Sequence, residues 1–210
     1  MRRISLKLKL FVAAAVVAAA AALPAVAGAR ATDTAPLQFF SDDSAVGSGA
    51  HTTLQRAADG VTLHVSGRKL GAGDAYTFWF VVFNDPENCS APGCGGDDIF
   101  LPDGNLNFAQ IAAADISVMW SGAGGVANRA GNLNASGGAG VGAAGAPGEV
   151  LFGNALVDHM GAEIHIVVRW HGPSTGNPAE TTTFDGSCVT DNVDDGLPCD
   201  DVQFSVHPAA

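Results

Sequence analysis

The segment Ala162–Pro173 (AEIHIVVRWHGP) alternates apolar and polar residues with a period of two over most of its length. Since successive side chains on a β-strand point to opposite faces, this period predicts a strand. One predicted face carries Ile164, Ile166, Val168 and Trp170, and the other carries Glu163, His165, Val167, Arg169 and His171. We expect this strand to lie at the centre of the fold, with its apolar face in the core.

Several other short segments have strand patterns, and turns rich in Gly and Asp separate them. Val61–Ser66 alternates, and Ala75–Asn84 is apolar on both faces, which is typical of a strand covered on both sides. The other predicted strands are Ile116–Trp120, one that begins at Thr181–Phe184, and Val202–His207, in which Val202, Phe204 and Val206 should face the core and Gln203, Ser205 and His207 solvent. Roughly six to nine strands predict an all-β fold, an antiparallel β-sandwich of the Ig-like or jelly-roll-like Greek-key kind.

Two segments are harder to interpret. Asn107–Asp115 is suited to a short helix. The Gly- and Ala-rich tract Gly122–Gly148 fits either a weak hairpin with one strand near Gly131–Ser136 or a long mobile loop.

The N-terminus has the pattern of a secretory signal peptide, residues 1–27. Basic residues precede the apolar run Leu10–Leu23, which is shorter than the roughly 20 residues of a membrane-spanning helix. Small residues follow, with cleavage expected before Gly28 or, alternatively, before Arg30. The pattern predicts a secreted or periplasmic protein without stable membrane insertion after cleavage. We expect a small polar leader over residues 28–60, either irregular or with one edge strand at Pro36–Ser41, and one sandwich domain over residues 61–210.

The chain is acidic, with a formal net charge of −11. Cleavage of the signal would leave six basic residues against twenty-one acidic ones, a charge of −15. Such a surface repels a phosphate backbone, so nucleic acid is excluded as a partner and an extracellular or envelope ligand is expected. Solubility outside the cell is the simplest explanation of the acidity.

The four cysteines form two close pairs in the sequence, Cys89 with Cys94 and Cys188 with Cys199. Sequence alone permits three pairings, and we favour the two local disulfides because an exported chain meets oxidising conditions. A four-thiolate zinc site is the alternative, although the spacings are not those usual for zinc.

Two sets of side chains are candidate metal ligands. His64, His165 and His207 come from separate predicted strands and would suit copper or zinc if the strands brought them together. Asp191, Asp194 and Asp195 lie in an acidic loop of the kind that binds calcium, although Val193 breaks the EF-hand spacing. The simpler interpretation of both sets is solvated polar residues, so no cofactor is firmly predicted.

No catalytic signature is present in the sequence. A G-x-G-x-x-G match at Gly140–Gly145 lacks the flanking strand and helix that give such a motif meaning. Arg169 is expected to pair with a carboxylate on a neighbouring strand. We therefore predict a non-catalytic binding or envelope-associated module; a metal-binding protein, or an enzyme with an unfamiliar site, is the alternative.

Four blocks of the sequence, AYTFWFVVFNDPENC, GAEIHIVVRWHGP, TTTFDGSC and DVQFSVH, occur in this order between about Val61 and His207. In these blocks the chain resembles a group of small exported bacterial proteins without an assigned activity. The resemblance implies the sandwich fold and export, and it implies no catalytic residue. The tract Gly122–Gly148 departs from the group's pattern.

Overall fold

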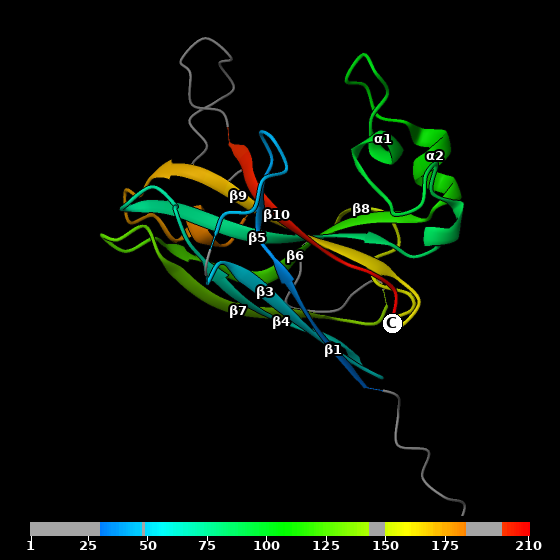
Figure 1. Ribbon diagram of the computed structural model, residues 1–210, viewed down its shortest axis with the longest axis horizontal. Helices are drawn as coiled ribbons and strands as arrows, with labels where there is room; N and C mark the ends of the chain where they lie inside the picture. Colours follow the sequence, from blue (N-terminus) through cyan, green and yellow to red (C-terminus); the bar gives the residue numbers. More distant parts are fainter. Residues whose placement is uncertain (1–29, 48, 143–149, 184–198) are drawn as a thin grey trace, which may run out of the picture.

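Two antiparallel sheets pack face to face in a computed structural model that describes residues 30–47, 49–142, 150–183 and 199–210 (Figure 1). The smaller sheet has the strand order β1–β3–β4–β7, with β1 Ala31–Pro36, β3 His51–Ala57, β4 Gly60–Gly67 and β7 Leu133–Gly140. The larger has the order β2–β10–β9–β5–β6–β8, with β2 Gln38–Phe39, β10 Asp200–His207, β9 Glu163–Pro173, β5 Asp74–Phe83, β6 Ile116–Val126 and β8 Val150–Phe152. The predicted all-β sandwich is confirmed.

Strand β9 lies inside the six-stranded sheet between β10 and β5, as its sequence pattern predicted. Its apolar face is buried between the sheets, where Ile164, Ile166 and Val168 have no exposed surface. Phe78 and Phe80 of β5 and Leu54 and Leu63 of the smaller sheet belong to the same core. Burial of these large side chains is the main stabilising contribution expected for such a fold.

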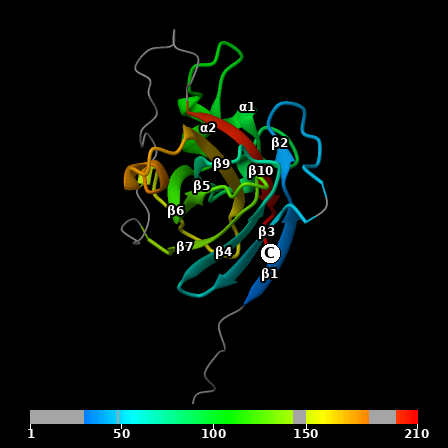
Figure 2. The same cartoon turned by 90° about the vertical axis from the view of Figure 1, so that its left-hand side faces the viewer.

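The outer face of the six-stranded sheet is partly covered by the segment between β5 and β6. This segment holds the short helices η1 Pro86–Asn88, α1 Gly96–Ile99 and α2 Phe108–Ala113; the last of these is the helix that the sequence predicted. In both views the segment lies on the side of the six-stranded sheet that faces away from the smaller sheet (Figures 1 and 2). A second apolar cluster forms there around Trp79, Phe83 and Ile116, which explains why β5 is apolar on both faces.

Close backbone contacts explain much of the Gly- and Ala-rich tract. Strand β7 lies within it, so the predicted strand is present, and β6 and β7 belong to different sheets that approach each other closely. A Cβ atom at Gly137 would lie 2.1 Å from the carbonyl oxygen of Ser121 on β6. At Gly60, the first residue of β4, which has a φ of +145°, a Cβ would lie 2.0 Å from the carbonyl oxygen of Ala139. Larger residues at these positions would push the strands apart.

The structure differs from the prediction in two places. In the predicted leader the expected edge strand is present as β2, within Pro36–Ser41, at an edge of the larger sheet, but the described part of the leader also contributes β1 and β3 to the smaller sheet, which was not expected. The small polar residues of β1 concealed this, since an edge strand exposed along most of one side needs little apolar character. Thr181, at which a strand was expected to begin, is instead the last residue of the 3-10 helix η2, Pro178–Thr181. Phe184 and the signal peptide lie outside the described residues.

Strand β10 is present, but its predicted faces are reversed from Gln203 to His207, whereas Val202 packs against the inner core as predicted. Gln203, Ser205 and His207 are buried, whereas Val202, Phe204 and Val206 are half-exposed. Register is the cause, because residues directly opposite in an antiparallel pair share a face. Phe204 pairs with Val167, and His207 with Ile164, so the polar side chains of β10 join the inner face. The inner residues find partners there: the Gln203 side chain donates to the carbonyl oxygen of Arg68 at 2.8 Å.

Candidate functional site

An apolar cleft of about 510 Å³ lies on the outer face of the six-stranded sheet, beside the part that the α1–α2 segment covers. Side chains of β5, β6, β8, β9 and β10 line it, together with α1, the residues that flank α1 and the loop that follows β2. The lining residues are Phe40, Asp43, Trp79, Val81, Cys94, Gly95, Gly96, Ile99, Phe100, Leu106, Val118, Leu151, Phe152, His165, Val167, Asp201, Phe204 and Val206. Its volume and composition are those of a small-molecule site.

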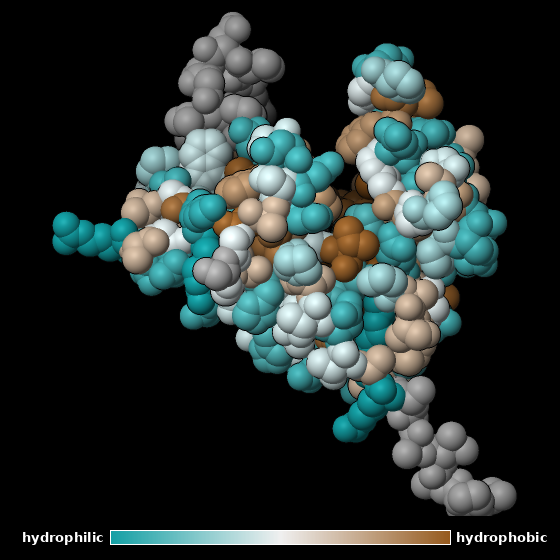
Figure 3. Space-filling model, in the orientation of Figure 1, coloured by the Kyte–Doolittle hydropathy of each residue, from teal (hydrophilic) through white to brown (hydrophobic). Residues whose placement is uncertain are grey.

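Exposed apolar side chains surround the cleft. Phe40, Phe100, Leu106 and Leu151 all line it, and each keeps at least 36 % of its surface exposed. In the space-filling view the surface is hollowed between the α1–α2 segment and the strands, with hydrophobic side chains in the hollow (Figure 3). Large exposed apolar groups gathered around a concave surface are typical of an interaction site, because each one loses water on binding.

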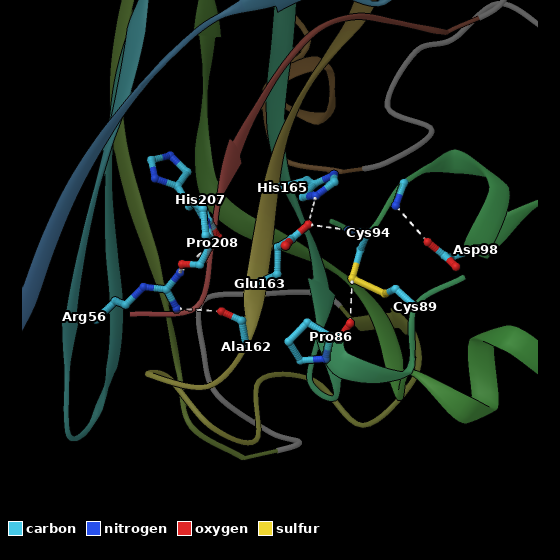
Figure 4. A network of polar contacts seen from close by, with 11 residues as sticks. Arg56, Pro86, Cys89, Cys94, Asp98, Ala162, Glu163, His165, His207 and Pro208 are labelled. Atoms are coloured by element: carbon cyan, nitrogen blue, oxygen red, sulfur yellow. Dashed lines mark hydrogen bonds and ion pairs between the residues drawn. A yellow bond between two sulfur atoms is a disulfide. The ribbon is translucent and has the colours of Figure 1, made fainter. Parts of the chain in front are cut away.

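A histidine and a glutamate on β9 provide the polar chemistry of the cleft. The Nε2 atom of His165 lies 2.8 Å from Oε1 of Glu163, and the same oxygen accepts the backbone N–H of Cys94 at 2.9 Å (Figure 4). The His165 ring also packs against Phe83, with ring centroids 4.9 Å apart. Glu163 is buried, so these contacts fix both the histidine and the segment that begins at Cys94.

The disulfide Cys89–Cys94 holds this wall of the cleft in place, and it confirms the first predicted pair. Cys94 itself lines the cleft. Asp98 of α1 accepts hydrogen bonds from the backbone N–H groups of Ser90 and Gly95, at 2.7 and 2.9 Å. Burial acts to raise the pKa of Asp98, but these bonds and the contact with Gln110 together lower it below its ordinary value. The second predicted pair includes Cys188, which lies outside the described residues.

The predicted metal cluster of His64, His165 and His207 does not form, so the expectation that these three histidines share an ion is wrong. His64 is exposed on β4 of the smaller sheet, where its Nδ1 bonds the Ser136 hydroxyl at 2.9 Å. His165 lines the cleft, and His207 is buried between the sheets. His207 pairs with Ile164, the residue before His165 on β9. Since adjacent residues of a strand point to opposite faces, His165 and His207 lie on opposite faces of the six-stranded sheet.

In the described part of the chain, one group of possible metal ligands does lie close together: Cys89, Cys94 and Asp98. The two sulfur atoms are joined to each other in a disulfide and are not available as thiolates. Asp191, Asp194 and Asp195 lie outside the described residues, so calcium binding there stays a prediction.

His207 belongs to a buried polar network instead. Its Nδ1 lies 2.8 Å from a carboxylate oxygen of Asp33, and its Nε2 lies 2.8 Å from the Thr52 hydroxyl, which in turn contacts the Ser205 hydroxyl at 2.6 Å. The order acid, imidazole, hydroxyl is that of a catalytic triad. However, Thr52, Ser205 and His207 have no exposed surface, so no substrate reaches the hydroxyl groups. The network therefore joins the two sheets.

A buried arginine lies near the same end of the interface. The Arg56 guanidinium donates to the carbonyl oxygens of His159, Ala162, His207 and Pro208, at distances from 2.7 to 3.2 Å. Figure 4 shows Arg56 together with Ala162, His207 and Pro208. Burial lowers its pKa, and Asp33 and Asp158 oppose this shift. Arg56 thus attaches the end of β10 and the start of β9 to the smaller sheet.

Arg169 pairs as predicted with a carboxylate on the neighbouring strand. Its guanidinium lies 3.1 Å from Asp201 of β10. No lysine or arginine of the described residues lines the cleft, whereas Asp43 and Asp201 do. The mouth of the cleft therefore disfavours anions.

Comparison of the chain with known protein families, curated proteins and solved structures found no match. Within the described residues, no helix combines the length and the apolar character needed to cross a bilayer.

Proposed function

We propose that this protein is a non-catalytic binding module, exported to the periplasm or the cell exterior, that holds an apolar ligand in the cleft on the outer face of the six-stranded sheet. The observation that carries the proposal is the combination of a concave apolar lining with exposed Phe40, Phe100 and Leu106 around it. Exposed aromatic groups are costly to solubility unless binding uses them.

The side chains of the cleft favour binding over catalysis. Among its described lining residues there is no serine, threonine, tyrosine or lysine, and its cysteine is in a disulfide. The hydroxyl, thiol and amine nucleophiles that many enzymes use in covalent catalysis are therefore missing from the described lining. The chain's acidity and its signal-like N-terminus support function outside the cytoplasm.

Titration with Nile red, an uncharged dye that fluoresces in apolar sites, tests the proposal. We expect saturable binding of one dye per chain, and at least fivefold weaker binding in Phe100→Ser, which removes a lining ring. Phe108→Ser is the matched control, because Phe108 is 72 % exposed on the same segment and does not line the cleft. Equal effects of the two substitutions, or no saturable binding, would overturn the proposal.

Catalysis is tested separately. We expect no turnover of ester, glycoside, phosphate or oxidase substrates by the purified protein. Turnover that His165→Gln abolishes would show that the Glu163–His165 pair acts as a base, and the module would then be an enzyme.

A further inference from the structure

We infer that the ligand of the cleft is an uncharged apolar molecule with one hydrogen-bond donor, an alcohol or a phenol, whose hydroxyl group binds Nδ1 of His165. This inference rests on the proposed function, because it names the chemistry of the ligand that the same cleft would hold.

His165 is the polar side chain of the cleft that is available to a ligand. The indole N–H of Trp79 already donates to the Thr77 hydroxyl at 2.8 Å. Asp43 and Asp201 are exposed, and Asp201 is paired with Arg169. The remaining described lining side chains are apolar, glycine or the disulfide. A ligand with one polar group therefore finds its most specific partner at His165.

The contacts of Glu163 determine what His165 offers. Its Oε1 accepts the N–H of Cys94, so this oxygen presents a lone pair to the histidine. Nε2 of His165 lies 2.8 Å away and carries the proton of that hydrogen bond. In the neutral ring the other nitrogen, Nδ1, then has a lone pair and accepts hydrogen bonds. No described group bonds Nδ1, and it is not among the buried atoms without a partner.

An acceptor inside an apolar cleft selects for a donor. A ligand without a donor would leave Nδ1 dehydrated and unpaired, which weakens its binding by about tenfold relative to a donor of the same shape. A carboxylate ligand has no hydrogen to donate, so its oxygen would face the lone pair of Nδ1, and it would also be repelled by Asp43 at the mouth. An ammonium ion would lose its hydration in an apolar site. A hydroxyl group meets none of these penalties.

Three naphthalene derivatives with the same ring system test the inference by displacement of Nile red: 2-naphthol, 2-methoxynaphthalene and 2-naphthoate. In the unmodified protein we expect 2-naphthol to bind about tenfold more tightly than 2-methoxynaphthalene, and 2-naphthoate to bind most weakly. In His165→Phe we expect 2-naphthol and 2-methoxynaphthalene to bind with about equal affinity, and 2-methoxynaphthalene should still bind. His64→Phe is the matched control, since His64 is exposed on the other sheet, and it should keep the full preference.

A measurement on the unmodified protein covers the case in which His165→Phe does not fold. With ¹⁵N-labelled histidine, the Nδ1 resonance of His165 should move on addition of 2-naphthol and stay in place with 2-methoxynaphthalene. Equal affinities for 2-naphthol and 2-methoxynaphthalene, a preference that survives His165→Phe, or an unmoved Nδ1 resonance at saturation would overturn the inference and leave the binding function intact. Failure of Nile red and of all three derivatives to bind would overturn the proposed function as well.

Discussion

Two histidine–carboxylate pairs lie on adjacent strands of one sheet and on its opposite faces. His207 of β10 is buried between the sheets, and both of its ring nitrogens are bonded, to Asp33 and to Thr52. His165 of β9 lies on the outer face and lines the cleft, where one nitrogen bonds Glu163 and the other has no hydrogen-bond partner among the described residues. The chemical groups are the same, and the number of free nitrogens differs. A histidine with both nitrogens bonded stabilises the fold, whereas one with a free nitrogen can also bind a ligand.

Replacement of each histidine by alanine should separate the two roles most clearly. We expect His207→Ala to lower the free energy of unfolding by about 3 kcal/mol, because it opens a cavity between the sheets and removes a partner from the buried Thr52 hydroxyl and from the Asp33 carboxylate. His165→Ala should lower the free energy of unfolding by only about 1 kcal/mol, since Glu163 keeps its hydrogen bond from the backbone N–H of Cys94. Urea unfolding measures both values. Equal losses would contradict the distinction.

Removal of the disulfide should affect the outer face more than the inner one. The variant Cys89→Ser/Cys94→Ser removes the constraint on a short loop in the unfolded chain, which should lower the free energy of unfolding by about 2 kcal/mol. It also loosens the wall that Cys94 forms and the bond from Cys94 to Glu163, so we expect Nile red affinity to fall at least fivefold. Far- and near-ultraviolet circular dichroism at low temperature checks that the sandwich persists. Unchanged dye affinity would show that the wall does not depend on this cross-link.

Acid should weaken the inner pair. Burial lowers the pKa of His207 below its ordinary value, although Asp33 acts in the opposite direction. A histidine whose folded-state pKa is lowered stabilises the protein fully above its unfolded pKa, about 6.5, and this contribution is lost as the pH falls toward the folded pKa. The free energy of unfolding should therefore decrease between pH 7.5 and 5.5. His207→Gln removes the titrating group and should flatten this slope; an unchanged slope would assign it to other residues.

Alternation predicted the β-strands well, and it did not predict which face of β10 is buried. The pattern of β9 was unambiguous because Ile164, Ile166 and Val168 form a continuous apolar row. On β10 the apolar row is Val202, Phe204 and Val206, and period alone assigned it to the core. Register with β9 reversed this assignment for Phe204 and Val206, and register depends on a distant strand that the local sequence does not reveal.

The same reversal hid the cleft from sequence analysis. Phe204 and Val206 line it only because they face outward, and Phe40 and Phe100 reach it from loops far apart in the chain. One signal was present in the sequence: Leu37 to Phe40 form an apolar run in a polar segment, and Phe100, Leu101 and Phe108 are large apolar residues around a turn. Such residues outside strands indicate an exposed apolar surface. Only the three-dimensional structure shows that Phe40 and Phe100 are the ones that meet in the cleft beside His165.

The smallest effect that we expect concerns the charge at the mouth of the cleft, which has no counterpart in the buried network. Asp43 is exposed, lines the cleft and has a φ of 56°, a conformation that asparagine tolerates well, so Asp43→Asn removes one charge with little strain. At low ionic strength this variant should bind 2-naphthoate about threefold more tightly and 2-naphthol equally well, because only the anion is repelled. Asp59→Asn, in the β3–β4 turn of the other sheet, is the control. Since salt screens exposed charges, the gain should disappear near 0.5 M NaCl, and a gain that persists there would indicate a change in the shape of the cleft instead of its charge.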